Sequence, residues 1–142
     1  MESSAQRELE TFLSEWPETP EGNRRAFARL LDFLSKLDDV VLDFIPRPGV
    51  TYSLRATHEA QRDRDLFVMV DVIEDNPRWL SICFYSDLVT DPEDRGDDVP
   101  EGLSGKDATC FDLESHDESA LAYLEARLRE AARNASGEDG DL

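Results

Sequence analysis

Three consecutive segments in the middle of the chain restrict its fold most. Residues 50–57 alternate between apolar and polar side chains, which is the period of a strand with one buried face. Residues 66–73 are apolar on both faces apart from Asp71, as in a central strand, and residues 79–85 form a further β-prone run. The connections between these segments are too short for a crossover, so consecutive strands must pair antiparallel. The sequence therefore predicts a β-meander.

Two shorter β-prone segments flank these three. Residues 40–45 are rich in β-formers and lead into a proline- and glycine-rich turn over 46–49. Residues 109–113 form the last short strand. The intervening residues 87–107 contain two prolines and three glycines and are too polar for a core element. Their length points to a functional or mobile connection. We therefore expect about five strands.

Three amphipathic segments predict helices. Apolar residues recur at helical spacing over 3–16, 19–37 and 115–135, and the first two segments form an αα-hairpin. The expected fold class is α+β: an antiparallel sheet of about five strands in a meander, with the N-terminal αα-hairpin and a C-terminal helix packed on it. This fold is expected to be a single domain over 1–135. Residues 136–142 are expected to be a disordered acidic tail.

Acidity is the strongest feature of the composition. The 142 residues carry a net charge of −18, and residues 87–118 hold twelve carboxylates against Arg95 and Lys106. Such a field repels phosphate backbones and anionic lipids, so the expected partners include no nucleic acid and no membrane. The same field attracts a basic protein surface. A salt-adapted host, or solubility alone, would also explain the charge.

Motifs for metal, nucleotide and nucleophile chemistry are missing from the sequence. No phosphate-binding glycine pattern occurs, and His58 and His116 lack the spacing of zinc ligands. A twelve-residue calcium-loop pattern starting at Asp91 fails because Arg95 occupies the fifth position, where an oxygen ligand is required. We therefore expect no metal and no cofactor. An enzyme that relies on carboxylates such as Asp71 remains the weakest alternative.

The cysteines and the apolar runs bear on the compartment. Cys83 and Cys110 each lie within an apolar run, which favours buried, reduced thiols over a disulfide. No apolar run is long enough to span a bilayer, and the first residues lack the pattern of a secretory signal. The expected location is cytoplasmic. The oligomeric state is left open.

Two groups of residues are candidates for binding. If the strands pair as predicted, one sheet face collects Arg55, Asp71 and Tyr85, with Trp79 at its edge. A charge inside an apolar strand is paired, exposed or functional, so Arg55 and Asp71 form either a structural ion pair or part of a small-ligand pocket with aromatic walls. The second group is the acidic set Asp91, Glu93, Asp94, Asp97 and Asp98.

Protein interaction is the function that the sequence favours. The concentrated negative charge predicts a non-enzymatic module that binds a basic protein partner through the acidic set, with an affinity that falls as salt rises. The alternative is a small-ligand binding domain that uses the sheet face around Asp71. The two hypotheses differ in whether salt or a specific metabolite controls binding.

Overall fold

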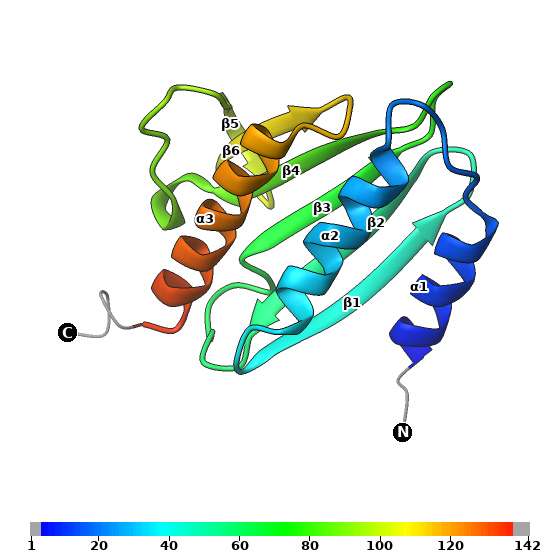
Figure 1. The fold of residues 1–142 in the computed structure, drawn as a ribbon. Coiled ribbons are helices and arrows are strands. Elements are labelled where there is room, and N and C mark those ends of the chain that lie inside the picture. The colour runs from blue at the N-terminus through cyan, green and yellow to red at the C-terminus, as the bar shows by residue number, and fades with distance from the viewer. Residues whose placement is uncertain (1–3, 138–142) are drawn as a thin grey trace.

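The computed structural model describes residues 4–137, which form three α-helices, one 3₁₀ turn and six β-strands. In chain order these are α1 (Ser4–Glu15), α2 (Asn23–Ser35), β1 (Val40–Arg47), β2 (Thr51–His58), β3 (Val68–Ile73), β4 (Trp79–Tyr85), η1 (Ser86–Leu88), β5 (Asp97–Leu103), β6 (Lys106–Leu113) and α3 (Glu118–Ala135). The fold is α+β, with the helices at the two ends of the chain and all the strands between them (Figure 1).

The strands form one antiparallel sheet in the order β1-β2-β3-β4-β6-β5. The first four strands follow the predicted meander. The predicted last strand, residues 109–113, lies within β6 and pairs with β4, as the meander requires. The strand β5 was not predicted, and it pairs with the outer edge of β6, so the six strands together do not run in chain order. The chain therefore forms the edge strand β5 first, and the following strand β6 then pairs with β4.

That edge strand, β5, also corrects the predicted number of strands from five to six. It lies inside the segment 87–107 that was expected to be one long connection, and all its side chains except Leu103 are exposed. It forms through pairing with β6, with an irregular register between Val99 and Leu103. A strand that buries almost nothing has no apolar alternation to reveal it. Pro100 and the irregular register are features that discourage further strand pairing at an edge.

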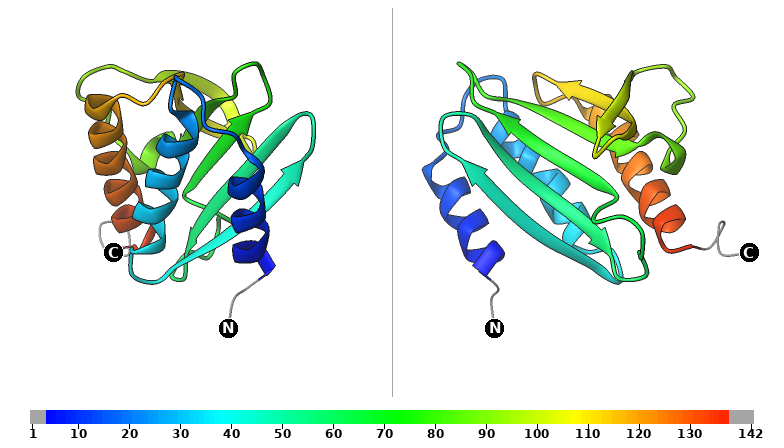
Figure 2. Two further views of the ribbon diagram at one scale, coloured as in Figure 1. Left: turned by 45° about the vertical axis from the view of Figure 1, so that its right-hand side comes forward. Right: turned by 180° about the vertical axis from the view of Figure 1, so that it is seen from behind.

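All three helices cover the same face of the sheet, and the view from behind shows the other face without a helix (Figure 2). The core lies between these layers. Leu54, Val70 and Ile82 of the central strands are fully buried against the helix layer, in one cluster with Phe27 of α2 and Leu121 of α3. Within residues 4–137, no helix is long and apolar enough to cross a membrane.

The start of α2 lies later than the sequence indicates. Residues 19–22 form a turn in which the Gly22 amide donates to the Thr19 carbonyl at 2.9 Å, and Gly22 has a φ of 77°, which glycine adopts without strain. Asn23 follows and is buried. Its Nδ2 donates to the carbonyls of Arg78 at 2.7 Å and Glu114 at 3.0 Å, which joins the start of α2 to two neighbouring connections.

The helix α3 begins at Glu118, within the predicted segment. The Asp117 carboxylate accepts a hydrogen bond from the Ala120 amide at 3.1 Å and caps the first turn. The helix ends in a turn in which the Gly137 amide donates to the Asn134 carbonyl. The remainder of the predicted acidic tail, residues 138–142, lies outside the described residues.

Cys83 and Cys110 are joined by a disulfide, so the prediction of reduced thiols is wrong. The two residues are direct partners across β4 and β6, and their Cα atoms are 4.1 Å apart. The bond depends on the register between β4 and β6, which sets the two residues opposite each other. The apolar runs around the cysteines do not indicate this register.

Candidate ligand-binding cleft

The four sheet residues that the sequence singled out lie on the face opposite the helices. The register pairs Arg55 with Met69, and Asp71 with Ser53 and Ser81, and it places Trp79 and Tyr85 on the same strand face as Ser81. The alternation in the sequence therefore gives the correct faces. Their role in ligand binding stays a prediction.

Arg55 and Asp71 do not form the ion pair that the sequence suggests. Arg55 instead donates from Nε to the Ser53 hydroxyl at 3.1 Å. Oδ1 of Asp71 is buried and accepts no hydrogen bond within the described residues. Burial raises the pKa of Asp71, although a hydrogen bond from Ser53 and the charges of Arg55 and Arg47 act in the opposite direction. Asp71 is thus a carboxylate that folding has partly removed from water.

Tyr85 is covered, whereas Trp79 reaches the surface. Tyr85 is 3% exposed, and the guanidinium of Arg64 lies 4.2 Å from its ring centroid. Arg64 also donates two hydrogen bonds to the Asp87 carboxylate, at 2.7 and 2.8 Å, which holds it in place. Trp79 is half-buried, and its indole N–H donates to Asp75 at 3.1 Å. Of the four residues, Arg55, Asp71 and Trp79 are therefore half-buried and Tyr85 is buried.

In the acidic set, Asp91 has a structural role. Its carboxylate accepts hydrogen bonds from the backbone amides of Arg95 at 3.0 Å and Gly96 at 2.8 Å, and from the hydroxyl of Tyr123 on α3. Burial acts to raise the pKa of Asp91, but these hydrogen bonds outweigh it and hold the pKa below its usual value. Asp91 therefore organises its own loop against α3.

The other members of the acidic set differ in their surroundings. The Glu93 carboxylate accepts from Arg95 Nε at 2.9 Å, whereas Asp94, Asp97 and Asp98 are exposed. Within residues 4–137, no group of three or more histidine, cysteine, aspartate or glutamate side chains could hold a metal ion. Partner binding through the acidic set stays a prediction.

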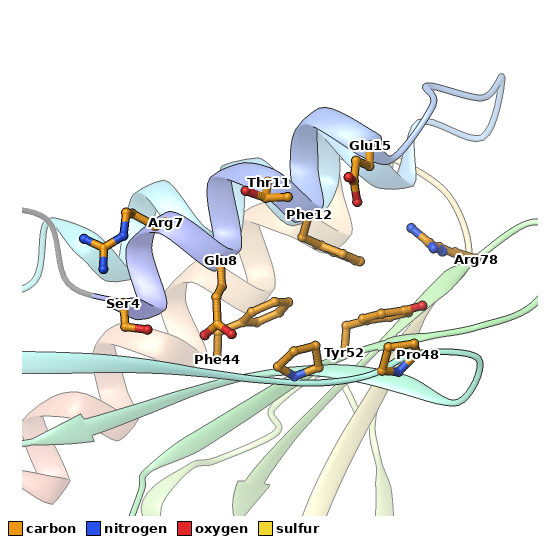
Figure 3. A pocket seen from close by; sticks show the side chains of 11 residues that line it. Ser4, Arg7, Glu8, Thr11, Phe12, Glu15, Phe44, Pro48, Tyr52 and Arg78 are labelled. Atoms are coloured by element: carbon orange, nitrogen blue, oxygen red, sulfur yellow. The ribbon is translucent and has the colours of Figure 1, made fainter.

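A hollow that none of these residues line lies between α1 and the hairpin formed by β1 and β2 (Figure 3). We call it the α1–hairpin cleft, and its volume is about 460 Å³. Its lining consists of Ser4, Arg7, Glu8, Thr11, Phe12, Glu15, Phe44, Pro46, Pro48, Tyr52 and Arg78. Phe44, Pro48 and Tyr52 lie on the hairpin side, which we call the floor, and Glu8 and Phe12 extend toward it from α1 (Figure 3). This combination of an apolar floor with a few charged groups is typical of a binding site.

Phe12 sets the position of α1 over the hairpin. Phe44 of β1 and Tyr52 of β2 both point to the helix side of the sheet, and Phe12 packs between them with ring centroids 5.3 and 4.6 Å away. Phe12 is also 6.0 Å from Phe27 of α2. These contacts fix the inner side of α1 on the core, so that the outer side overhangs the edge strand and leaves the cleft beneath it.

Arg78 closes one end of the cleft. Its guanidinium lies 5.2 Å from the ring centroid of Phe12, 5.4 Å from that of Trp16 and 4.9 Å from that of Tyr52. Its Nη2 donates to Glu74 at 3.0 Å, whereas its Nη1 makes no hydrogen bond within residues 4–137. The hydrogen bond from Arg78 lowers the pKa of Glu74, with support from the Tyr52 hydroxyl and against the effect of burial. The guanidinium is therefore held rigidly, with one donor group left over.

Two carboxylates face the cleft from α1. Glu8 and Glu15 are seven residues apart, which places them on one side of the helix, and both are exposed. Neither forms an ion pair within the described residues 4–137. The bases in the lining are Arg7 and Arg78, and Arg78 is already paired with Glu74. The cleft thus presents the carboxylates of Glu8 and Glu15 to a ligand, together with Arg7 from the same helix.

Sequence reasoning misses this cleft because its parts are far apart in the chain. The lining comes from residues 4–15, 44–52 and 78, and their meeting depends on where α1 crosses the sheet edge. The seven-residue spacing of Glu8 and Glu15 is a visible signal. The spacing alone does not indicate a binding site, because the sequence does not show that α1 lies above aromatic side chains.

Comparisons with known proteins identify no relative. No protein-family model matches the sequence, and no curated protein or solved structure matches it either. The function of the chain is therefore inferred from its own side chains.

Proposed function

We propose that the chain is a non-enzymatic protein-interaction module that binds a basic segment of a partner in the α1–hairpin cleft. The observation that carries this proposal is the position of Glu8 and Glu15, two carboxylates that form no ion pair within residues 4–137 and lie above an apolar floor. An arginine or lysine of a partner can lay its aliphatic part on such a floor and bring its charge to a carboxylate. The aliphatic part of the basic side chain then contacts the floor, and its charged end contacts a carboxylate.

The charge of the whole chain supports the same proposal. A net charge of −18, with Asp94, Asp97 and Asp98 exposed in the most acidic segment, attracts a basic partner over distances of about one Debye length. In this proposal the acidic set increases the association rate, and the cleft supplies the contacts. Both effects weaken as salt rises.

The test uses a defined basic probe. A fluorescein-labelled peptide with three Arg-Gly-Ser repeats is titrated with the protein, and anisotropy is recorded at about 50 and 200 mM salt. The variant E8Q/E15Q should bind about three- to tenfold more weakly, since exposed ion pairs contribute about 0.2–1 kcal/mol each. The matched control is E10Q/E59Q, which removes the same charge at two exposed carboxylates outside the cleft lining.

Two results would count against this function. An equal loss of affinity in both double variants would mean that the peptide senses only the net charge of the chain. An absence of binding by the wild-type protein at low salt would remove the proposal altogether.

Small-ligand binding at the sheet face is the second candidate. It is favoured by the buried Oδ1 of Asp71, which has no hydrogen-bond donor within the described residues. A panel of amine and guanidinium metabolites is screened by thermal shift with the wild-type protein and with Asp71→Asn. A shift confined to the wild type would support this candidate, whereas equal shifts would leave Asp71 with a structural role only.

The cytoplasmic location expected from the sequence stays a proposal, and the disulfide between Cys83 and Cys110 argues against it. The same two cysteines provide its test. In a reducing cytosol the two cysteines would be held as thiols, whereas an oxidising compartment preserves the disulfide. Alkylation of intact cells followed by mass measurement of the protein reports which form is present. Two alkylated thiols support the cytoplasm, and an unmodified pair contradicts it.

A further inference from the structure

We infer that the segment bound in the α1–hairpin cleft is a proline-rich polyproline II helix whose basic residues stand three positions apart. This inference rests on the proposed function and names the conformation and sequence pattern of the partner. Four features of the cleft lead to it: its floor, the spacing of its carboxylates, the outer edge of β1 and the free donor of Arg78.

The floor has the composition that suits a polyproline II ligand. Phe12, Phe44 and Tyr52 line the cleft and are 4–8% exposed, and the exposed Pro46 and Pro48 line it beside them. Proline-rich segments bind to aromatic-lined grooves of this kind, because their preformed helix loses little conformational entropy on binding. The length also agrees: the twelve residues of α1 span about 18 Å, which is the length of about six residues of polyproline II.

The carboxylates match the repeat of such a helix. Glu8 and Glu15 are separated by about 10 Å along the axis of α1, at a rise of 1.5 Å per residue. Polyproline II has three residues per turn, so every third side chain points the same way, at a spacing of about 9 Å. Basic residues at positions i and i+3 of the ligand therefore reach one carboxylate each. A ligand helix with basic residues four positions apart would turn one of them away.

The outer edge of β1 argues against a bound β-strand. Pro46 has no N–H, and the Phe44 amide donates to the Asp43 carboxylate at 2.9 Å, so two positions on this edge offer no donor to an incoming strand. A polyproline II segment forms no ladder and does not need these donors. The cleft is thus closed to strand addition but open to a ligand that binds through its side chains.

Arg78 can donate a hydrogen bond to the backbone of the same ligand. The carbonyls of a polyproline II helix have no internal partners and remain available as acceptors. Nη1 of Arg78 makes no hydrogen bond within residues 4–137, and Figure 3 shows the guanidinium at the end of the cleft, extending into the space between α1 and Tyr52. The fixed guanidinium can therefore donate to a ligand carbonyl without first losing a partner, because Glu74 remains bound to its other edge.

The test compares three labelled peptides that each carry three arginines. One has three Arg-Pro-Pro repeats, one has three Arg-Gly-Ser repeats, and one has three Arg-Pro-Pro-Pro repeats, which change the spacing from three to four. Anisotropy titrations with the wild-type protein should show the first peptide binding about tenfold more tightly than the flexible second one, because its conformation is preformed. The third peptide should lose most of that gain.

A pair of matched variants locates the binding. Thr11→Trp fills the cleft from an exposed position of α1, whereas Ser14→Trp places the same side chain at an exposed position outside the cleft lining. Far-UV circular dichroism establishes that both variants are folded. The Arg-Pro-Pro peptide should lose at least tenfold in affinity with the first variant and keep its affinity with the second.

The outcomes separate this inference from the proposed function. If the Arg-Pro-Pro and Arg-Gly-Ser peptides bind equally and only Thr11→Trp weakens them, the polyproline conformation is wrong and the basic-segment function stands. If neither peptide binds, both are wrong. If the proline peptide binds more tightly but Thr11→Trp and Ser14→Trp behave alike, the site is elsewhere and the inference is overturned.

Discussion

The guanidinium of Arg78 lies 4.9 Å from the ring centroid of Tyr52, and both side chains donate hydrogen bonds to the Glu74 carboxylate. The three residues join β2 to the β3–β4 connection beneath α1. We predict that Arg78→Ala lowers the free energy of unfolding by about 1–3 kcal/mol, through lost cation–π contacts and an unpaired Glu74. Urea denaturation measures the change. Arg78→Lys should recover only part of it, since lysine lacks the planar fork. An unchanged stability in Arg78→Ala would contradict this role.

Asp71 should make stability depend on pH. Because burial raises the pKa of Asp71 above its usual 3.8, ionisation of this carboxyl opposes folding, and stability falls as pH rises through the raised pKa. We predict that Asp71→Asn is more stable than the wild type at neutral pH. The difference should shrink as the pH falls below the raised value and vanish under strongly acidic conditions. Thermal unfolding at a series of pH values provides the test, and a variant less stable than the wild type at pH 7 would refute it.

The disulfide between Cys83 and Cys110 should contribute measurably to stability. The bond closes a loop with a sequence separation of 27, for which the chain-entropy model gives about 3–4 kcal/mol. We predict that a phosphine reductant lowers the midpoint of thermal unfolding, and that C83S/C110S unfolds at the temperature of the reduced protein. A thiol assay on denatured, non-reduced protein is the control. Two free thiols in that assay would show that the bond does not form.

The hydrogen bonds of Asp91 should stabilise the loop that precedes β5. Asp91→Asn removes the negative charge of the carboxylate that accepts hydrogen bonds from the backbone amides of Arg95 and Gly96. We predict that this lowers the free energy of unfolding by about 1–3 kcal/mol. Because the pKa of Asp91 is lowered by these bonds, the contribution is present above the usual value of 3.8 and is lost as the pH falls through the lowered pKa. Asp98→Asn, at an exposed position of β5, is the control and should change stability little.

The parts of this fold that can be predicted from the sequence are those whose signals lie in neighbouring residues. The alternation over 50–57 gives the faces of β2, because this signal arises from neighbouring residues. The turn signal at 46–49 predicts the break between β1 and β2, although β1 continues to Arg47 and the turn occupies residues 48–50. The strand β5 escapes prediction because its side chains are exposed and main-chain pairing alone forms it. The pairing of residues 109–113 with β4 agrees with the predicted meander, but the register that sets Cys83 opposite Cys110 is not visible in the sequence, so the bond between them was not indicated.

The candidate sites differ in the same way. The face shared by Arg55, Asp71 and Trp79 follows from strand alternation, and the register confirms the shared face. The contact partners of Arg55 do not follow, because the choice between Asp71 and Ser53 depends on side-chain geometry. The cleft could not be predicted at all, since it exists only where α1 overhangs the edge of the sheet.

The most direct test of binding in the α1–hairpin cleft is a titration of isotope-labelled protein with the Arg-Pro-Pro peptide, followed by amide chemical shifts. The predicted result is a set of saturable shifts at the cleft residues Glu8, Thr11, Phe44 and Tyr52, with small changes at residues 91–98. Shifts concentrated at residues 91–98 or at Asp71, with the cleft unaffected, would contradict it.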